Sequence, residues 1–591
     1  MNETKMATVI FFDREDVESS SKVSYGAHAI TLSPSASLAA QEAGLDVCEA
    51  TSLFVGASHA RCAALAHRTL KEFDQATIHM ELPASVALMA RQSAWSHANL
   101  VERLRRSLPP GPWIARNRYG VWVKATDWTT LQAILLPRIW DYGLGHRMPS
   151  SRPLFPGLFK RFTQLAASLA RRRSKYWVAS SSRKLKNGLQ DSLLDTAACV
   201  AVFQPTHGGW SDYRSIFADL RSSKTVRTFP ISPLRQDESV VKIVIKKLEM
   251  AGRAFSDPRV LSAWQLYAPY FEKILPAMLG ITAEGPTLMR VLAIRSAVTY
   301  EANSWLSASL MEAAGTLGVN RVVFNHNSQP SCDTPIADSV LKFLFEQRTC
   351  NELVDIAALW SPASENWPRS GKTRVICVKL QYPTSTSAQK GRKLQILHAG
   401  NYQNWSDFFP WIAQTADEYL KGLITLANVV EQLEGVELVV RVRPKREVDA
   451  AAVARVLGNR RNVTICGVEQ DFLVQLAGSD LLVAHFSTTI EQALQMGKLV
   501  LQWGSANRYE QFRGQQTPPA GTFNDRVYTA HTPESLEAML LGIRDSLDEY
   551  PKVADNINPY GFDIHTQTVE DLARYLLTPE VKLPTSEKEL L

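Results

Sequence analysis

The segment that most constrains the fold is residues 480–503, DLLVAHFSTTIEQALQMGKLVLQW. An apolar run at 481–486 is followed by three hydroxyl residues, by helix-forming residues up to Met496, and by a second apolar run from Leu499. Gly497 is a natural helix stop. This order predicts a strand, a tight turn, a short helix and a second strand, the repeating unit of an open parallel sheet. The sequence therefore favours an α/β fold.

The hydroxyl turn of this segment, Ser487, Thr488 and Thr489, follows the first predicted strand directly. Ligands bind at that end of parallel strands, because helix N-termini offer free backbone N–H groups to an anion. We expect a phosphate to accept from these groups and from the hydroxyls, and Glu491 to accept from a ribose diol. The alternative is structural, since Thr488 and Glu491 also have the spacing of a capping box, which only satisfies the helix start.

The size and composition of the chain indicate a soluble protein of several units. A chain of 591 residues is too long for one hydrophobic core, which predicts two Rossmann-like domains with additional elements. It is 45% hydrophobic and 21% charged, with no apolar run long enough to span a bilayer. The first residues, MNETKMATVIFFDRE, argue against a secretory signal. The seven cysteines form no C-x-x-C pair, which predicts reduced thiols in a cytoplasmic protein and no metal site.

The amino-terminal part of the chain alternates apolar runs with helical patterns. Strands are predicted at residues 8–12 and 28–32, and we assign residues 1–345 to an N-terminal α/β domain. Further on, the apolar residues 289–294 precede a polar turn that contains Glu301. Another predicted strand, 321–324, leads into His326.

A basic segment interrupts this domain near residues 155–190. Between residues 160 and 186 nine basic residues occur without an acid, interleaved with apolar and aromatic ones. A basic helix with an apolar stripe can lie on an anionic membrane surface. It can equally be a solvated helix face that packs on the domain. Nucleic-acid binding is the weakest interpretation, because no recognised module accompanies the segment.

The second half of the chain begins after an interdomain crossing at residues 346–392 and forms a predicted domain at 393–575, followed by a tail at 576–591. Its strands are predicted at 394–398, 436–442 and 463–466 before the segment described first. Three loops then follow strand ends, and they predict a phosphate site in one cleft that faces the first domain. The loop residues with this predicted role are Gly400, Asn401, Arg441, Arg443, Lys445, Ser487, Thr488 and Thr489.

These motifs resemble those of GT-B glycosyltransferases of bacterial surface-polysaccharide biosynthesis. The turn, the Glu and the helix ending in Gly497-Lys498 resemble the family's nucleotide-binding stretch, although Leu499 stands where a proline is frequent. The run from Arg441 to Lys445 resembles the Arg-x-His-Pro motif of capsule, sialic-acid and teichoic-acid transferases, with an arginine at the histidine position. The resemblance implies that Glu491 holds the ribose of the donor.

The resemblance implies a GT-B fold, in which two doubly wound Rossmann-like domains face each other across a cleft. It also implies a metal-independent enzyme without a cofactor, whose substrate is a CMP- or UDP-linked sugar. Glycosyl transfer requires a stabilised leaving phosphate, and an inverting enzyme also requires a base. For that base Glu301 is preferred over His326 and His207, and its structural alternative is an acid that a helix N-terminus favours.

The implied acceptor is a glycan or lipid-linked glycan of the capsule or lipopolysaccharide type, close to the membrane. We expect a cytoplasmic protein that binds no nucleic acid, with peripheral attachment to the inner face of the cytoplasmic membrane as an open alternative. Three other functions fit the same architecture. They are a CDP-glycerol or CDP-ribitol phosphotransferase, a sugar-nucleotide epimerase, and a non-catalytic nucleotide- or glycan-binding subunit of a polysaccharide assembly complex.

Overall fold

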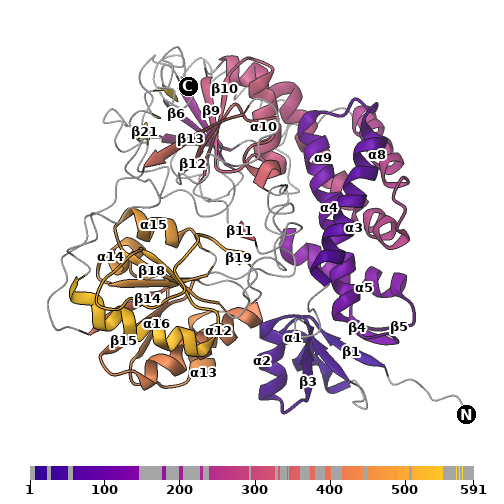
Figure 1. Ribbon diagram of the computed structural model, residues 1–591. Coiled ribbons are helices and arrows are strands. Elements are labelled where there is room, and N and C mark those ends of the chain that lie inside the picture. Colours follow the sequence, from indigo (N-terminus) through magenta and orange to yellow (C-terminus); the bar gives the residue numbers. More distant parts are fainter. Residues whose placement is uncertain are drawn as a thin grey trace, which may run out of the picture.

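The computed structural model contains three sheets and a two-stranded ribbon in the part of the chain that it describes (Figure 1). The described residues are 7–22, 28–50, 58–144, 176–180, 199–203, 226–230, 238–291, 294–325, 331–332, 343, 345–359, 373–379, 393–400, 416–443, 449–485, 487–504, 509–549, 567–568, 572 and 575–576.

The first sheet has five strands in the order β3-β2-β1-β4-β5, parallel except for β5. Its central strand is fully buried, as expected for a sheet covered on both faces. The short helices α1 and α2 begin at the side-chain caps Asp13 and Ser33. The elements are β1 (Thr8–Phe11), α1 (Arg14–Glu18), η1 (Ser19–Lys22), β2 (Ala29–Thr31), α2 (Pro34–Glu42), β3 (Val47–Glu49), β4 (Trp113–Arg116) and β5 (Trp122–Ala125).

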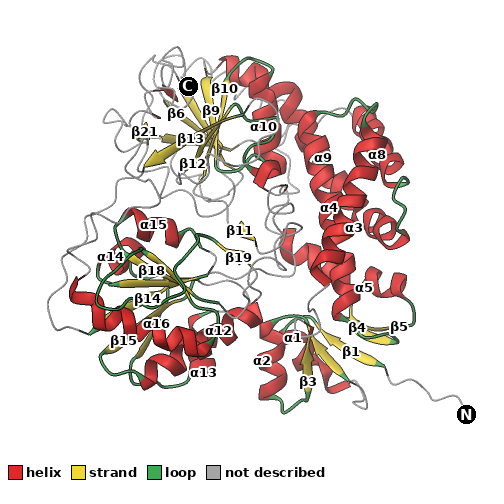
Figure 2. Ribbon diagram, viewed as in Figure 1, coloured by secondary structure: helices red, strands yellow, loops and turns green. Residues whose placement is uncertain are grey.

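A bundle of long helices joins this sheet to the next (Figure 2). Helix α3 packs on α4, and α4, α5 and α8 pack on α9. One connected hydrophobic core runs from the five-stranded sheet through the bundle to the eight-stranded sheet. The helices are α3 (Ser58–Thr77), α4 (Ala84–Ser107), α5 (Trp128–Leu144), α8 (Glu238–Gly252) and α9 (Pro258–Val291).

The eight-stranded sheet is parallel throughout, in the order β21-β13-β12-β10-β9-β7-β6-β8. Its edge strand β21 comes from far beyond the second domain, so the chain returns to its first half near its end. The elements are β6 (Tyr176–Ser180), β7 (Cys199–Phe203), β8 (Val226–Pro230), β9 (Ile294–Thr299), α10 (Trp305–Gly315), β10 (Asn320–Asn325), β12 (Ile356–Leu359), β13 (Arg374–Lys379) and β21 (Gln567–Thr568).

The third sheet has six parallel strands in the order β16-β15-β14-β17-β18-β20. Apolar side chains of α12, α13 and α16 cover one face, and those of α14 and α15 cover the other. The elements are β14 (Leu394–His398), α12 (Ala416–Gln432), β15 (Val436–Arg441), α13 (Ala450–Leu457), β16 (Val463–Cys466), α14 (Phe472–Ala477), β17 (Leu481–Ala484), α15 (Thr489–Gln495), β18 (Leu499–Gln502), β20 (Val527–Thr529), α16 (Pro533–Ser546) and η5 (Leu547–Glu549).

The predicted fold class is therefore confirmed: an α/β chain with two Rossmann-like parallel sheets, the architecture of the GT-B class. The domain boundaries stay a prediction, and the structure adds that the strands within residues 1–345 belong to two sheets.

The basic segment needs a correction, because residues 176–180 form strand β6 and not part of a helix. The sequence there, YWVAS, is rich in residues with strong strand propensity. The remainder of the segment lies outside the described residues.

Candidate functional site

The predicted phosphate site lies at the carboxyl edge of the six-stranded sheet. The strand order reverses between β14 and β17, which are direct neighbours, and such a switch point is where open parallel sheets bind ligands. The loop after β14 contains Gly400, and the loop after β17 contains Ser487. Thr489 joins the two loops, because its hydroxyl donates to the carbonyl oxygen of Ala399 at 3.0 Å. The structure thus brings these two predicted loops together.

The start of helix α15 is not a capping box. Thr488 is the N-cap residue, but its side chain makes no capping hydrogen bond. Ser487 takes that position, because its Oγ accepts from the Thr489 N–H at 3.3 Å and lies 2.8 Å from the Thr489 hydroxyl. The structural alternative for Thr488 and Glu491 is therefore wrong. The helix has only seven residues, so hydrogen bonds contribute more at this edge than a helix dipole does.

Glu491 lies on the buried side of α15 and has no exposed surface. Its Oε1 accepts from the Gln511 amide at 3.4 Å. The same amide accepts from the Ser487 backbone N–H at 3.1 Å, so Gln511 connects the hydroxyl turn to the carboxylate. Burying an acid is costly unless it has polar partners, and the Gln511 amide is one such partner of Glu491. Glu491 is therefore linked to the hydroxyl turn through Gln511.

Sequence analysis missed Gln511, which follows a short ribbon between the two halves of the chain. Strand β11 (Ser331–Cys332) pairs antiparallel with β19 (Tyr509–Glu510). Figure 1 shows this ribbon between the two larger sheets. The side chain of Gln502, on β18, then holds the backbone of Gln511 and Phe512 through its amide. A two-residue strand with a distant partner leaves no periodic signal in the sequence.

The glycine turn after β14 packs against a buried histidine. A Cβ at Gly400 would lie 3.0 Å from His398 Cε1 and 3.1 Å from Tyr419 Cε2, so a larger residue requires these rings to move. His398 is 4% exposed, and burial lowers its pKa to about 4. Its Nδ1 has no hydrogen-bond partner among the described residues. A neutral imidazole thus lies beside the turn, a feature that the strand prediction for 394–398 did not include.

The predicted arginines at the next strand end have a different environment. Arg441 donates to the Gln470 carbonyl oxygen at 2.7 Å, and its guanidinium lies 5.8 Å from the Phe472 ring. These contacts hold it on the β16–α14 connection. Arg443 is exposed in a different loop, the one that follows β15. Asn401 and Lys445 lie outside the described residues.

In the first half, Glu301 follows strand β9 and pairs with Arg348. The Arg348 Nη2 donates to Glu301 Oε1 at 2.6 Å, and the Ala302 N–H donates to the Arg348 carbonyl oxygen at 2.9 Å. Helix α10 is capped by Ser304, and its first turn contains no acid. Glu301 is therefore not an acid in the first turn of a helix, which was its structural alternative. His207 and His326 lie outside the described residues.

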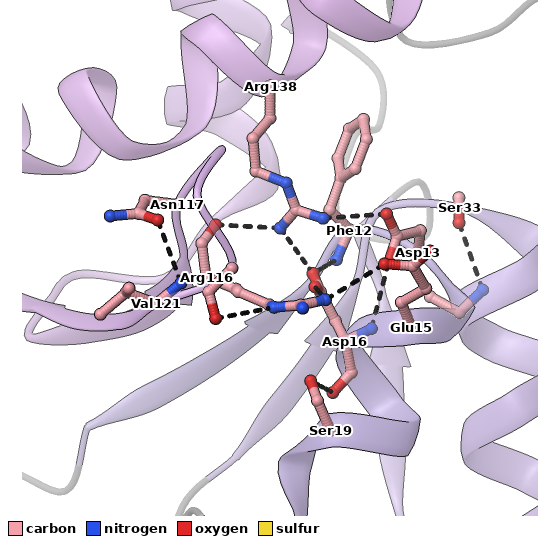
Figure 3. A network of polar contacts seen from close by, with 12 residues as sticks. Phe12, Asp13, Glu15, Asp16, Ser19, Ser33, Arg116, Asn117, Val121 and Arg138 are labelled. Atoms are coloured by element: carbon pink, nitrogen blue, oxygen red, sulfur yellow. Dashed lines mark hydrogen bonds and ion pairs between the residues drawn. The ribbon is translucent and has the colours of Figure 1, made fainter.

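A second polar cluster lies at the carboxyl end of β1 (Figure 3). Arg138 donates to Asp16 at 2.8 Å and to Asp13 at 2.9 Å, and the Phe12 N–H donates to Asp16 at 2.8 Å. Arg116 lies 3.5 Å from the other oxygen of Asp16. Burial raises the pKa of Asp16, and the Arg138 guanidinium opposes this change. The charges neutralise one another, so we assign this cluster a structural role.

Among the described residues, none of the helices combines the length and the hydrophobicity needed to cross a membrane. Within the same residues, no three metal-ligating side chains gather into a site.

Comparison with known proteins finds similarity at the level of solved structures only. No known family profile and no curated protein matches the sequence. MurG of Acinetobacter baumannii is 13% identical with a TM-score of 0.34, and the match covers 68% of this chain and 99% of that one. The UDP-GlcNAc 2-epimerase of Neisseria meningitidis bound to UDP-GlcNAc is 11% identical with a TM-score of 0.35, and the match covers 64% of this chain and 98% of that one. The lipopolysaccharide outer core galactosyltransferase WaaB is 10% identical with a TM-score of 0.35, and the match covers 69% of this chain and 99% of that one. TM-scores this low carry no argument, so the fold class rests on this chain's own strand order.

Proposed function

We propose that the protein is a glycosyltransferase that moves a sugar from a nucleotide-sugar donor, CMP- or UDP-linked, to a surface-glycan acceptor. The observation that carries the proposal is the buried carboxylate of Glu491, one turn after the hydroxyl turn at the switch point of the six-stranded sheet. A ribose diol is the donor group that a carboxylate at this distance from a phosphate site suits best. The missing side-chain cap at Thr488 supports this role, because the acid is not needed to close the helix.

In this proposal the hydroxyl turn and the glycine turn bind the donor phosphates. The Ser487 N–H and hydroxyl donate to phosphate oxygens, the Thr489 hydroxyl holds the two turns together, and Gly400 allows the backbone to approach the phosphates closely. Arg443, exposed at the adjacent strand end, contributes positive charge toward the leaving nucleotide. These residues bind and orient the donor and stabilise the charge that develops on its phosphate. No metal ion is part of the proposal.

On the acceptor side, Glu301 is the proposed base for the acceptor hydroxyl. Arg348 holds one of its oxygens and so fixes the orientation of the carboxylate. The membrane-proximal location of the acceptor is supported only by the basic composition of residues 160–186.

A thermal-shift screen with CMP, CDP, UDP and GDP tests donor binding. A ligand that binds only the folded chain raises its melting temperature by mass action. We expect CMP or UDP to raise it, and a protein that responds to none of the four would contradict the proposal.

Turnover then separates the alternatives. A transferase releases free nucleotide from the nucleotide sugar only when an acceptor glycan is present. Isomerisation of the nucleotide sugar without an acceptor would identify an epimerase instead. Nucleotide binding without either reaction would identify a binding subunit.

A further inference from the structure

The side-chain amide of Gln511 touches both groups that the proposed function assigns to the donor. Its Oε1 accepts from the Ser487 N–H at 3.1 Å, and its Nε2 donates to Glu491 Oε1 at 3.4 Å. Gln511 is 7% exposed and Glu491 is fully buried. A single neutral side chain therefore meets a backbone donor on one side and a carboxylate acceptor on the other.

A nucleotide offers the same pair of hydrogen-bonding groups. A phosphate oxygen accepts from a backbone N–H, and a ribose hydroxyl donates to a carboxylate. The Gln511 amide presents an acceptor to Ser487 and a donor to Glu491, in the same order. A ligand that uses the Ser487 N–H and Oε1 of Glu491 therefore replaces both contacts of the amide.

We propose that Gln511 is a placeholder for the nucleotide: its amide satisfies Ser487 and Glu491 in the ligand-free protein and is displaced when the donor binds. The inference rests on the proposed function of this edge. The amide gives the buried Glu491 carboxylate a polar partner, which lowers the cost of burying that group. The amide keeps the site formed and reduces the affinity of the ligand that replaces it.

The backbone around Gln511 is fixed independently of its side chain. Gln502 Oε1 accepts from the N–H groups of Gln511 and Phe512, each at 3.0 Å, and Gln502 Nε2 donates to the Phe512 carbonyl oxygen at 2.6 Å. On the other side, β19 pairs with β11 of the first half. Displacement therefore moves the Gln511 side chain while these contacts hold the neighbouring backbone in place.

The test is the affinity of UDP for the full chain with and without this amide, measured by titration calorimetry. Gln511→Met keeps a similar volume but makes no equivalent hydrogen bonds. We expect it to bind UDP about threefold to tenfold more tightly than the native chain, because the ligand no longer replaces two hydrogen bonds. Gln516→Met, at an exposed position nearby in sequence, is the matched control and should leave the affinity unchanged.

Weaker UDP binding by Gln511→Met would overturn the inference, since Gln511 would then be a ligand contact. Unchanged binding would overturn it too, since the amide would then serve the fold alone. Gln511→Asn shortens the side chain by one methylene, so its amide cannot reach both groups. It should also bind more tightly, and it replaces Gln511→Met if that variant does not fold.

The inference and the proposed function can fail separately. If the native chain binds UDP and Glu491→Gln weakens that binding, the donor site stands whatever Gln511→Met does. If the native chain binds none of CMP, CDP, UDP and GDP, the donor site and the placeholder both fall.

Discussion

The five-stranded and six-stranded sheets share a strand pattern but differ in what occupies their carboxyl edges. In both, the order reverses beside the first strand, at β1–β4 in one and β14–β17 in the other. At β1, guanidinium groups neutralise the buried carboxylate of Asp16. At β17, a neutral amide meets the buried carboxylate of Glu491. Opposite charges in low dielectric hold each other strongly, whereas an amide is readily exchanged for a ligand of similar pattern. The two edges thus share a strand order and differ in the charge of the side chains that contact the buried acid.

The largest expected effect comes from breaking the charged cluster. Arg138→Met leaves Asp16 buried without its main partner, and we expect a loss of about 3–5 kcal/mol in the free energy of unfolding. Urea unfolding measures this loss. Arg14→Met removes an exposed arginine from two ion pairs and should cost at most about 1 kcal/mol. A loss of nucleotide affinity in Arg138→Met, at temperatures where it is folded, would contradict the structural role of the cluster.

Acid should affect the two edges in opposite directions. Burial lowers the pKa of His398 to about 4 from the usual 6.5, so below pH 6.5 the unfolded chain takes up a proton that the folded chain does not. Stability from this group is therefore lost as pH falls from 6.5 to 4. The pKa of Asp16 is raised instead, so the folded chain retains this proton at higher pH than the unfolded chain does.

His398→Asn should reduce the stability lost between pH 6.5 and 4 by up to about 1.4 kcal/mol per pH unit. Urea unfolding at several pH values measures the slope. An unchanged slope in the variant would show that His398 is accessible to protons in the folded chain.

Two substitutions at the proposed phosphate site should affect binding more than stability, although Ser487→Ala also removes the contact that its Oγ makes to the Thr489 N–H, at a cost of about 1 kcal/mol. Arg443→Ala and Ser487→Ala each remove a proposed phosphate contact, and we expect each to weaken nucleotide binding at least tenfold, about 1.4 kcal/mol. Calorimetric titration with UDP or CMP measures the change. Native affinity in both variants would remove the phosphate site from this edge.

The smallest expected effect on the free protein is that of Glu491→Gln. Glutamine retains an oxygen that can accept from the Gln511 amide, so the melting temperature of the free chain should stay within about two degrees of the native value. A neutral oxygen accepts the ribose hydroxyls less strongly, so the nucleotide-induced shift should fall substantially. An unchanged shift, beside an early-melting Glu491→Ala, would return Glu491 to a structural role.

Local patterns predicted the secondary structure of residues 481–502 well, because each element there is formed by contiguous residues. The apolar runs predicted β17 and β18, and Gly497 predicted the end of α15, because strand and helix patterns are short-range signals. The spacing of Thr488 and Glu491 was misleading as a capping box, because Ser487 took that position. Spacing alone does not determine which of three adjacent hydroxyls turns toward the helix.

Contacts distant in sequence account for what was missed. Gln511 is placed by a ribbon whose other strand begins at Ser331, and no local pattern encodes such a pairing. Similarly, β4 lies beside β1 although two long helices separate them in the chain, so the five-stranded sheet could not be distinguished from the eight-stranded one. The helical interpretation of the basic segment failed at β6 because charge outweighed strand propensity in that prediction.

The return of the chain to its first half affects how the protein can be made. Strand β21 completes the eight-stranded sheet beside β13, and the Ser296 hydroxyl donates to the Leu576 carbonyl oxygen at 2.9 Å. Residues of the first half therefore contact partners that are synthesised only after the whole six-stranded sheet. Until then β13 presents an open edge, the kind of surface on which nascent chains aggregate. The half of the chain that is synthesised first is thus completed last.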